Sequence, residues 1–268
     1  MNRIYLKIIL FFLSIVVLIG GLIYLNQESF IFYPTKYAPE KSFVYQRHFK
    51  EVNLKSFDQK NINNLYFEVD KPKGVVYFLH GNSGNLSTWG NIADFYLDNN
   101  YNVFITDYRG YGKSEGKIFS QEQLFRDAQV GYDYLKKYFD ESQIIVVGYS
   151  IGTGIASYLA STNNPKILIL QAPYFNLREE MHSRMPFLPE FLLKYPLENN
   201  TYIPAIKCPV YIFHGTKDQV ISYTHSYKLK NLLKEKDNYF SIANQGHIGI
   251  NDHFTFQKNI SAILRDSL

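Results

Sequence analysis

Cysteine is almost absent from this sequence. The 268 residues contain a single cysteine, Cys208, which excludes an intrachain disulfide and a zinc site built on cysteines. Cys208 precedes Pro209 at the start of an apolar run, where a buried, unreactive thiol is expected. No cysteine stands directly after the apolar segment at the N-terminus, so lipoprotein processing at that point is also excluded.

An excess of charge of one sign is lacking as well. Lysine and arginine number 28 and aspartate and glutamate 24, which gives a formal net charge of +4. Nucleic-acid partners usually require a clustered basic stripe, so we expect no nucleic-acid binding. His182 lies near Glu179 and Glu180, but no second histidine follows at metal-ligand spacing. We therefore expect neither a metal nor a cofactor.

Long hydrophobic runs are rare, with one exception near the N-terminus. Residues 8–25 are almost unbroken in their apolarity and are just long enough to cross a bilayer. Arg3 and Lys7 precede this run, and Glu28 is the first charge after it. We predict a single-pass membrane anchor over residues 1–26, with its N-terminus in the cytoplasm and the remaining chain on the extracytoplasmic side.

A cleaved signal peptide, which would leave a secreted protein, is the alternative to this anchor. A signal peptide normally has a shorter apolar region that ends in a small-x-small cleavage site. The run here ends Gly-Gly-Leu-Ile-Tyr-Leu, so an uncleaved anchor is favoured.

Residues 27–41 hold several aromatic residues and two prolines, and we interpret them as a connector with aromatic anchors at the membrane interface.

The rest of the chain, residues 27–268, is predicted to be one α/β domain. Residues 43–54 and 62–69 form a predicted hairpin. Short apolar runs then predict strands at residues 75–79, 103–106, 144–147, 167–170, 210–213 and 239–243. Helix-length segments alternate with them at residues 87–99, 120–139, 151–161, 222–236 and 252–264. This alternation indicates a doubly wound, mostly parallel sheet.

Residues 173–207 interrupt the alternation. They separate two strands that a short crossover would normally join. The interval contains an apolar cluster that needs a surface to cover, formed by Met185, Phe187, Leu188, Phe191, Leu192 and Leu193. The interval is a candidate lid over an acyl-binding pocket, and the alternative is an ordinary helical insertion packed on the core.

The segment Gly148-Tyr149-Ser150-Ile151-Gly152 has the pattern Gly-x-Ser-x-Gly between a predicted strand and a predicted helix. Such a turn raises the serine hydroxyl above the sheet, and only small flanking residues let strand and helix approach closely. We predict that Ser150 is a nucleophile.

A serine hydroxyl needs a general base to become a nucleophile. In enzymes with the Gly-x-Ser-x-Gly turn, the histidine that serves as this base comes after the serine in the sequence. His247 lies in a turn just past the final predicted strand, where catalytic groups collect in open α/β sheets. His225 falls inside a predicted helix, and His253 falls at the start of the last predicted helix. We therefore predict His247 as the general base.

The acid that orients the base should lie between the serine and the histidine. Asp218 lies in the loop at residues 214–218, which comes directly after the strand at residues 210–213, whereas Asp237 and Asp252 resemble helix-flanking surface residues. For the oxyanion, we expect the backbone N–H of Ile151 and that of Asn82, in the glycine-containing loop after residues 75–79.

Five motifs in this order resemble the α/β-hydrolase superfamily. They are His80-Gly81-Asn82, the segment at residues 107–114, the segment around Ser150, the segment at residues 214–218, and Gly246-His247. They are most similar to the membrane-anchored branch with bud-emergence-type hydrolases and serine-aminopeptidase-like lipases. The resemblance implies an α/β-hydrolase fold with Ser150, Asp218 and His247 as the triad and Asn82 and Ile151 as oxyanion donors. It leaves the substrate open.

The sequence thus predicts a membrane-anchored serine hydrolase. We expect it to cleave a carboxylic ester, from a lipid or a small acyl ester, through an acyl-enzyme on Ser150. A thioesterase or a serine peptidase would use the same triad. A hydrolase-like binding module without catalysis is the alternative from another class, but such a module has no need of an intact triad and oxyanion loop.

Overall fold

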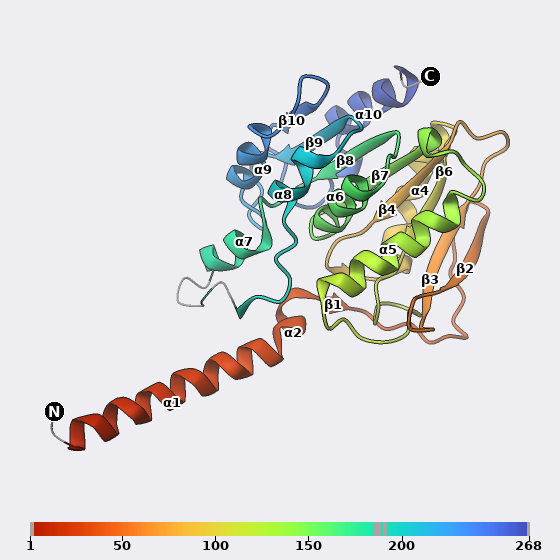
Figure 1. The fold of residues 1–268 in the computed structure, drawn as a ribbon. Helices are drawn as coiled ribbons and strands as arrows, with labels where there is room; N and C mark the ends of the chain where they lie inside the picture. Colours follow the sequence, from red (N-terminus) through yellow and green to blue (C-terminus); the bar gives the residue numbers. More distant parts are fainter. Residues whose placement is uncertain (1–2, 185–188, 190–191, 267–268) are drawn as a thin grey trace.

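A computed structural model describes residues 3–184, 189 and 192–266 of the chain (Figure 1). An eight-stranded sheet crosses the domain. In spatial order its strands are β10 (Asn238–Ile242), β9 (Val210–Gly215), β8 (Ile167–Gln171), β7 (Ile144–Tyr149), β4 (Val75–Leu79), β6 (Asn102–Thr106), β3 (Asn61–Phe67) and β2 (Phe49–Lys55). The strands from β10 to β6 run parallel, and β3 and β2 join them antiparallel. The predicted doubly wound, mostly parallel sheet is confirmed.

Two hydrophobic layers cover the sheet, one on each face. Along β4, Val75, Tyr77 and Leu79 belong to one buried cluster, and Val76 and Phe78 belong to the other. This division follows from the alternation of side chains along a strand, and it explains why β4 is apolar at every position.

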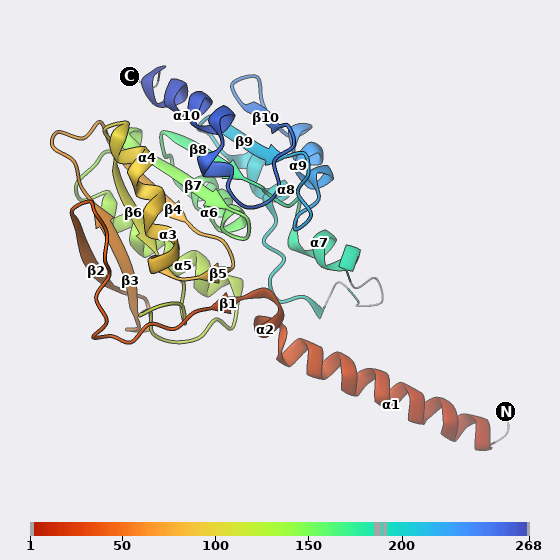
Figure 2. The ribbon, with the colours of Figure 1, turned by 180° about the vertical axis from the view of Figure 1, so that it is seen from behind.

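Helices complete both layers (Figures 1 and 2). The first layer contains α5 (Gln121–Leu135), α6 (Gly152–Thr162) and α9 (Tyr223–Lys230). The second contains α3 (Leu86–Trp89), α4 (Ala93–Asp98) and α10 (Phe254–Asp266). The parallel strands therefore all end at one edge of a covered sheet, and the loops at that edge carry the predicted site residues.

Three predicted helices are shorter than expected. In the segment at residues 120–139, α5 already ends at Leu135. The segment at residues 87–99 divides into α3, the 3-10 turn η1 (Gly90–Ile92) and α4, since a glycine weakens a continuous α-helix. In the segment at residues 222–236, the helix α9 already ends at Lys230. Turns follow it, and the side chain of Asp237 accepts the backbone N–H of Lys234. The predicted hairpin forms, but its first strand begins at Phe49 and not at residue 43.

The N-terminal helix α1 (Arg3–Leu25) projects away from the domain (Figure 2). None of its residues is buried, and its most apolar 18-residue window has a mean hydropathy of 2.9. It is therefore long and apolar enough to cross a membrane. Such a helix near an N-terminus also has the properties of a signal sequence.

The segment after α1 packs on the domain. It contains α2 (Gln27–Ile31) and β1 (Tyr33–Pro34), and β1 pairs in parallel with β5 (Ser83–Gly84), in the loop that follows β4. We call residues 27–34 the juxtamembrane segment. Phe32 in it is buried against Tyr195, so the prediction that these aromatic residues face the membrane interface was wrong for Phe32.

The insertion at residues 173–207 contains α7 (Leu177–Arg184), α8 (Asn199–Tyr202) and the 3-10 turn η4 (Ile203–Ala205). Four residues of its predicted apolar cluster lie outside the described residues, namely Met185, Phe187, Leu188 and Phe191. Leu193 is buried in the core. The insertion borders the juxtamembrane segment, because the side chain of Gln27 accepts the backbone N–H of Lys194 at 2.9 Å.

Candidate active site

Ser150 lies on a strained turn between β7 and α6. Its φ angle is +54°, a left-handed conformation that is uncommon for residues other than glycine. A Cβ atom on Gly148 would come within 2.7 Å of the Cβ of Ala156, and one on Gly152 would come within 2.6 Å of the backbone oxygen of His80. Both glycines are therefore required by the close approach of backbone segments around the serine. The turn holds the Ser150 side chain at the carboxyl edge of the sheet.

The three predicted triad residues meet there. The Nε2 atom of His247 lies 3.0 Å from the Oγ atom of Ser150, and its Nδ1 atom lies 2.7 Å from an oxygen of Asp218. Since the carboxylate accepts the Nδ1–H, the Nε2 atom is left as an acceptor for the serine proton. Residues from the turn after β7, the loop after β9 and the loop after β10 thus form one continuous hydrogen-bonded chain.

The carboxylate of Asp218 is surrounded by donors. Its Oδ2 atom accepts hydrogen bonds from His247 and, at 3.1 Å, from the Nε2–H of His214. Its Oδ1 atom accepts the backbone N–H groups of Val220 and Ile221 at 2.8 and 2.9 Å. Burial raises the pKa of Asp218, but the hydrogen bonds from the two histidines outweigh it and hold the pKa well below its ordinary value. The residue is therefore a carboxylate at neutral pH.

Two backbone N–H groups border the serine. Within the described part of the chain, neither the N–H of Asn82 nor that of Ile151 donates to a protein acceptor. Both residues and Ser150 line one cavity. The backbone oxygen of Asn82 accepts the Tyr33 N–H at 2.8 Å and the Tyr111 hydroxyl at 2.7 Å, and these two hydrogen bonds fix the position of the loop after β4. Free N–H groups beside a nucleophile are suited to bind a developing oxyanion.

His80 is fully buried behind this loop. Its Nδ1 atom lies 2.7 Å from the backbone oxygen of Gly81, and its Nε2 atom lies 3.2 Å from an oxygen of Asp107. The second contact is close enough for an ion pair but too poorly aligned for a hydrogen bond. Burial raises the pKa of Asp107. The pair packs between aromatic rings and does not reach the serine, which matches a structural role for His80.

The rival residues are engaged elsewhere. His225 in α9 faces Glu180 at 3.1 Å, and the Nδ1 atom of His253 accepts a backbone N–H at the start of α10. Asp237 accepts two backbone N–H groups, and Asp252 is exposed in the turn η5 (Ile250–Asp252). Among the described residues, no group of three or more histidine, cysteine, aspartate or glutamate side chains is placed to hold a metal ion.

Two residues that the sequence did not predict help to position the triad. His214 donates a hydrogen bond to Asp218, whereas in the sequence it was only the first residue of the motif at residues 214–218. Tyr149, inside the Gly-x-Ser-x-Gly pattern, donates its hydroxyl to the backbone oxygen of His247. The juxtamembrane segment also reaches the site, because Phe30, Ile31 and Tyr33 line the same cavity as the serine. No local pattern in the sequence signals these contacts between distant segments.

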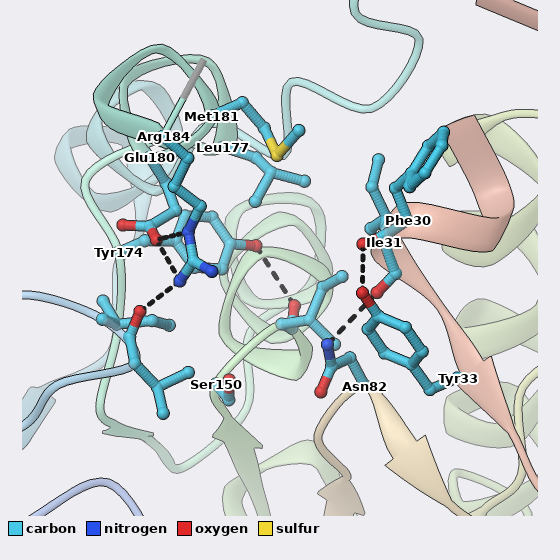
Figure 3. Close-up of a pocket in the computed structure, with 13 residues that line it drawn as sticks. Phe30, Ile31, Tyr33, Asn82, Ser150, Tyr174, Leu177, Glu180, Met181 and Arg184 are labelled. Atoms are coloured by element: carbon cyan, nitrogen blue, oxygen red, sulfur yellow. Dashed lines mark hydrogen bonds and ion pairs between the residues drawn. The ribbon is translucent and has the colours of Figure 1, made fainter. Parts of the chain in front are cut away.

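Ser150 lies where two cavities meet. The first, of about 290 Å³, lies between α7 and the juxtamembrane segment, and we call it the α7 cavity (Figure 3). The second, of about 510 Å³, lies between the loop after β4 and the loop after β10, and we call it the loop cavity. The site therefore has room for a substrate on both sides of the serine.

The chain is similar to known hydrolases. Residues 70–199 match the family described as serine aminopeptidase, S33. The chain is 31% identical over 192 residues to protein L404 of Acanthamoeba polyphaga mimivirus, named as an alpha/beta hydrolase, and this match covers 70% of the chain and 72% of L404. It is 27% identical over 228 residues to protein bem46 of Schizosaccharomyces pombe, covering 78% of the chain and 75% of bem46.

Two further similarities concern a lipase and an esterase. The chain is 30% identical over 182 residues to the lysophosphatidylserine lipase ABHD12 of Danio rerio, over 60% of the chain and about half (47%) of that lipase. The solved structure of esterase Pf2001 from Pyrococcus furiosus has a TM-score of 0.71 at 17% identity, covering 88% of this chain and 97% of that one. The fold and family predicted from the five motifs are confirmed. The chain belongs to the alpha/beta hydrolase superfamily.

Proposed function

We propose that this protein is a serine esterase. The Oγ atom of Ser150 attacks the carbonyl carbon of an ester while the Nε2 atom of His247 takes its proton. The N–H groups of Asn82 and Ile151 bind the oxyanion of the tetrahedral intermediate. The carbon–oxygen bond then breaks, and the alcohol leaves with the proton from His247. Water, deprotonated by the same imidazole, releases the acid from the acyl-enzyme and restores the serine.

The observation that carries this proposal is the chain of hydrogen bonds from Asp218 through His247 to Ser150, with distances of 2.7 and 3.0 Å. Because the carboxylate of Asp218 accepts the Nδ1–H of His247, the Nε2 atom is left free to take the serine proton, as a general base requires. A binding module has no physical reason to keep this tautomer beside two free N–H groups.

An ester is favoured over the other carbonyl substrates. The apolar wall of the α7 cavity suits an acyl chain, and a lipase and an esterase are among the similar proteins. Thioesters share this acyl group and come second.

A peptide bond is the next candidate, because of the aminopeptidase family that residues 70–199 match. An aminopeptidase must bind a substrate ammonium with a free carboxylate. In the α7 cavity the carboxylate of Glu180 is already paired, with Arg184 at 2.7 Å and His225 at 3.1 Å. This pairing disfavours a peptide substrate.

The proposal includes the location of the enzyme. α1 anchors the protein as a single membrane-spanning helix, with Arg3 and Lys7 on the cytoplasmic side and the domain on the extracytoplasmic side. The hydropathy of α1 and the absence of burial along it support this arrangement. Protease added outside intact cells should digest the domain. Full protection of the domain, with digestion only after lysis, would contradict this orientation.

A fluorophosphonate probe tests the chemistry. It should label the wild-type protein and fail to label Ser150→Ala of equal thermal stability. Hydrolysis of p-nitrophenyl acetate should be lost in His247→Ala and retained in His253→Ala, because His247 lies 3.0 Å from the serine hydroxyl whereas His253 accepts a backbone N–H at the start of α10. Unlabelled, folded wild type would favour a binding module, and activity that depends on His253 instead would overturn the choice of base.

A further inference from the structure

The two cavities at Ser150 have different relations to the catalytic groups. Both are lined by Ser150 and Asn82. Ile151, one of the two oxyanion donors of the proposed mechanism, lines the α7 cavity, whereas His247 lines the loop cavity. The base therefore lies to one side of the nucleophile, and this asymmetry determines how a substrate can be oriented.

The leaving alcohol must lie beside His247. When the tetrahedral intermediate breaks, the alkoxide oxygen takes its proton from the Nε2 atom, and this transfer requires hydrogen-bond reach. Of the two cavities, the loop cavity is the one that His247 lines. The acyl group remains bonded to Ser150 on the other side of the carbonyl carbon, so it occupies the α7 cavity.

The chemistry of the α7 cavity suits an apolar chain. Leu177 and Met181 from α7 face Phe30 and Ile31 from the juxtamembrane segment across the cavity, with Ser150 at its base (Figure 3). Its charged residues, Glu180 and Arg184, compensate each other through a hydrogen bond of 2.7 Å. An uncharged chain can therefore enter this cavity without leaving a charged side chain buried and unpaired.

This apolar cavity adjoins the end of α1. The juxtamembrane segment, which forms one wall, starts two residues after α1 ends. Its position is fixed by the side chains of Gln27 and Glu28, which accept the backbone N–H of Lys194 at 2.9 Å and its ammonium at 3.0 Å. The part of the site that suits an acyl chain is thus held beside the helix that is apolar enough to enter a membrane.

The chemistry of the loop cavity suits a polar, uncharged group. Thr88, Asn91 and Asn251 offer hydroxyl and amide groups, and Asp252 is an exposed carboxylate. No lysine or arginine is among the described residues that line this cavity. A phosphate on the alcohol would therefore meet a like charge and no cation, which strongly disfavours binding, whereas hydroxyl groups would find donors and acceptors.

We propose that the substrate is an ester of a linear fatty acid with an uncharged polyhydroxy alcohol, the acyl chain lying against Met181 and the alcohol beside Asp252. This inference rests on the proposed esterase function. It makes Met181 and Asp252 specificity residues for the two halves of the substrate, and each half can be tested separately.

The acyl half is tested by filling the α7 cavity with Met181→Trp. Val44→Trp places the same side chain on an exposed loop position and is the matched control. The ratio of kcat/KM for p-nitrophenyl decanoate over the acetate should fall at least about 100-fold in Met181→Trp, since each buried methylene contributes to discrimination. The ratio should stay at the wild-type value in Val44→Trp. An unchanged ratio in labelled, folded Met181→Trp would overturn the acyl assignment.

The alcohol half is tested with two substrates that share a decanoyl chain, 1-decanoylglycerol and its 3-phosphate. The wild type should prefer the uncharged ester by at least about 10-fold in kcat/KM, and Asp252→Lys should reduce or reverse this preference. Glu235→Lys makes the same charge change at an exposed position outside both cavities and should leave the preference unchanged. A wild type that prefers the phosphate ester would contradict the inference.

Failure of this inference and failure of the proposed function give different results. If the esterase chemistry is absent, neither p-nitrophenyl ester is cleaved and the fluorophosphonate does not label Ser150. If only the substrate assignment is wrong, labelling and acetate hydrolysis persist while the two ratios do not respond to the variants. The labelling experiment on each variant therefore separates the two outcomes.

Discussion

Asp218→Asn replaces one oxygen of a carboxylate that four N–H groups surround. His214 and His247 donate to Oδ2, and the backbone of Val220 and Ile221 donates to Oδ1. An amide has one acceptor oxygen, so its NH₂ group must face one of these two pairs. Backbone N–H groups cannot lose their protons, whereas an imidazole can shift its own between ring nitrogens. The NH₂ group therefore faces the two histidines.

This arrangement harms both activity and stability. His247 then accepts at Nδ1 and carries its proton on Nε2, which cannot take the proton of Ser150, and kcat should fall by about 10⁴-fold. His214 carries its proton on Nδ1, which is buried without a partner, and Ile221 loses the donor to its carbonyl oxygen. The Nδ1 atom of His214 already lacks a partner in the wild type, so the carbonyl oxygen of Ile221 is the group that becomes newly unsatisfied. One such buried group costs about 1–3 kcal/mol, and the free energy of unfolding should fall by about this amount.

The stability difference should depend on pH with a definite sign. The folded state lowers the pKa of Asp218 below its ordinary value, and an unfolded aspartate titrates at about 3.9. The carboxylate therefore stabilises the fold fully above about pH 4, and this contribution is lost as the pH falls below that value. The gap between wild type and Asp218→Asn should be constant near neutral pH and shrink on acidification.

Urea denaturation at several pH values and kcat for p-nitrophenyl acetate measure these effects. Asp237→Asn is the matched control, because Asp237 also accepts two backbone N–H groups but lies outside the site. It should lose some stability and keep wild-type kcat. An Asp218→Asn variant with kcat within about 10-fold of the wild type would refute the orienting role assigned to the carboxylate.

Three further predictions follow from packing. Gly152→Ala should lower the free energy of unfolding by about 3 kcal/mol or more in urea denaturation, since its Cβ would lie 2.6 Å from the oxygen of His80; a neutral effect would contradict the close approach. Burial raises the pKa of the Cys208 thiol to about 12, so Ellman's reagent at pH 8 should react with it after unfolding only. Removal of residues 1–25 should leave kcat/KM for p-nitrophenyl acetate unchanged, since none of α1 is buried; loss of this activity would mean that α1 supports the site.

The parts of the site that could be predicted are those with a local physical cause. The glycines around Ser150 are needed by contacts within one strand–turn–helix unit, so their spacing is readable in the chain. The buried strands are apolar at consecutive positions because both faces are covered. Strand ends then place Asp218 and His247 at one edge, where the structure brings them together.

The parts that could not be predicted depend on contacts between distant segments. The juxtamembrane segment reaches the serine because β1 pairs with β5, some 50 residues away in the chain, and no periodic pattern encodes that pairing. His214 donates to Asp218 because the loop after β9 turns back on itself. The aromatic residues after α1 satisfy a membrane-interface pattern equally well, which is why the burial of Phe32 was missed.

Detection of an acyl-enzyme tests the central claim most directly. The protein is mixed with excess p-nitrophenyl decanoate, quenched in acid within the first turnovers, and examined by mass spectrometry of the peptide that contains Ser150. We predict one decanoyl group on Ser150 in the wild type and none in Ser150→Ala, together with a burst of p-nitrophenol before steady-state turnover. Steady hydrolysis by Ser150→Ala at the wild-type rate, with no adduct on the wild-type serine, would contradict the account.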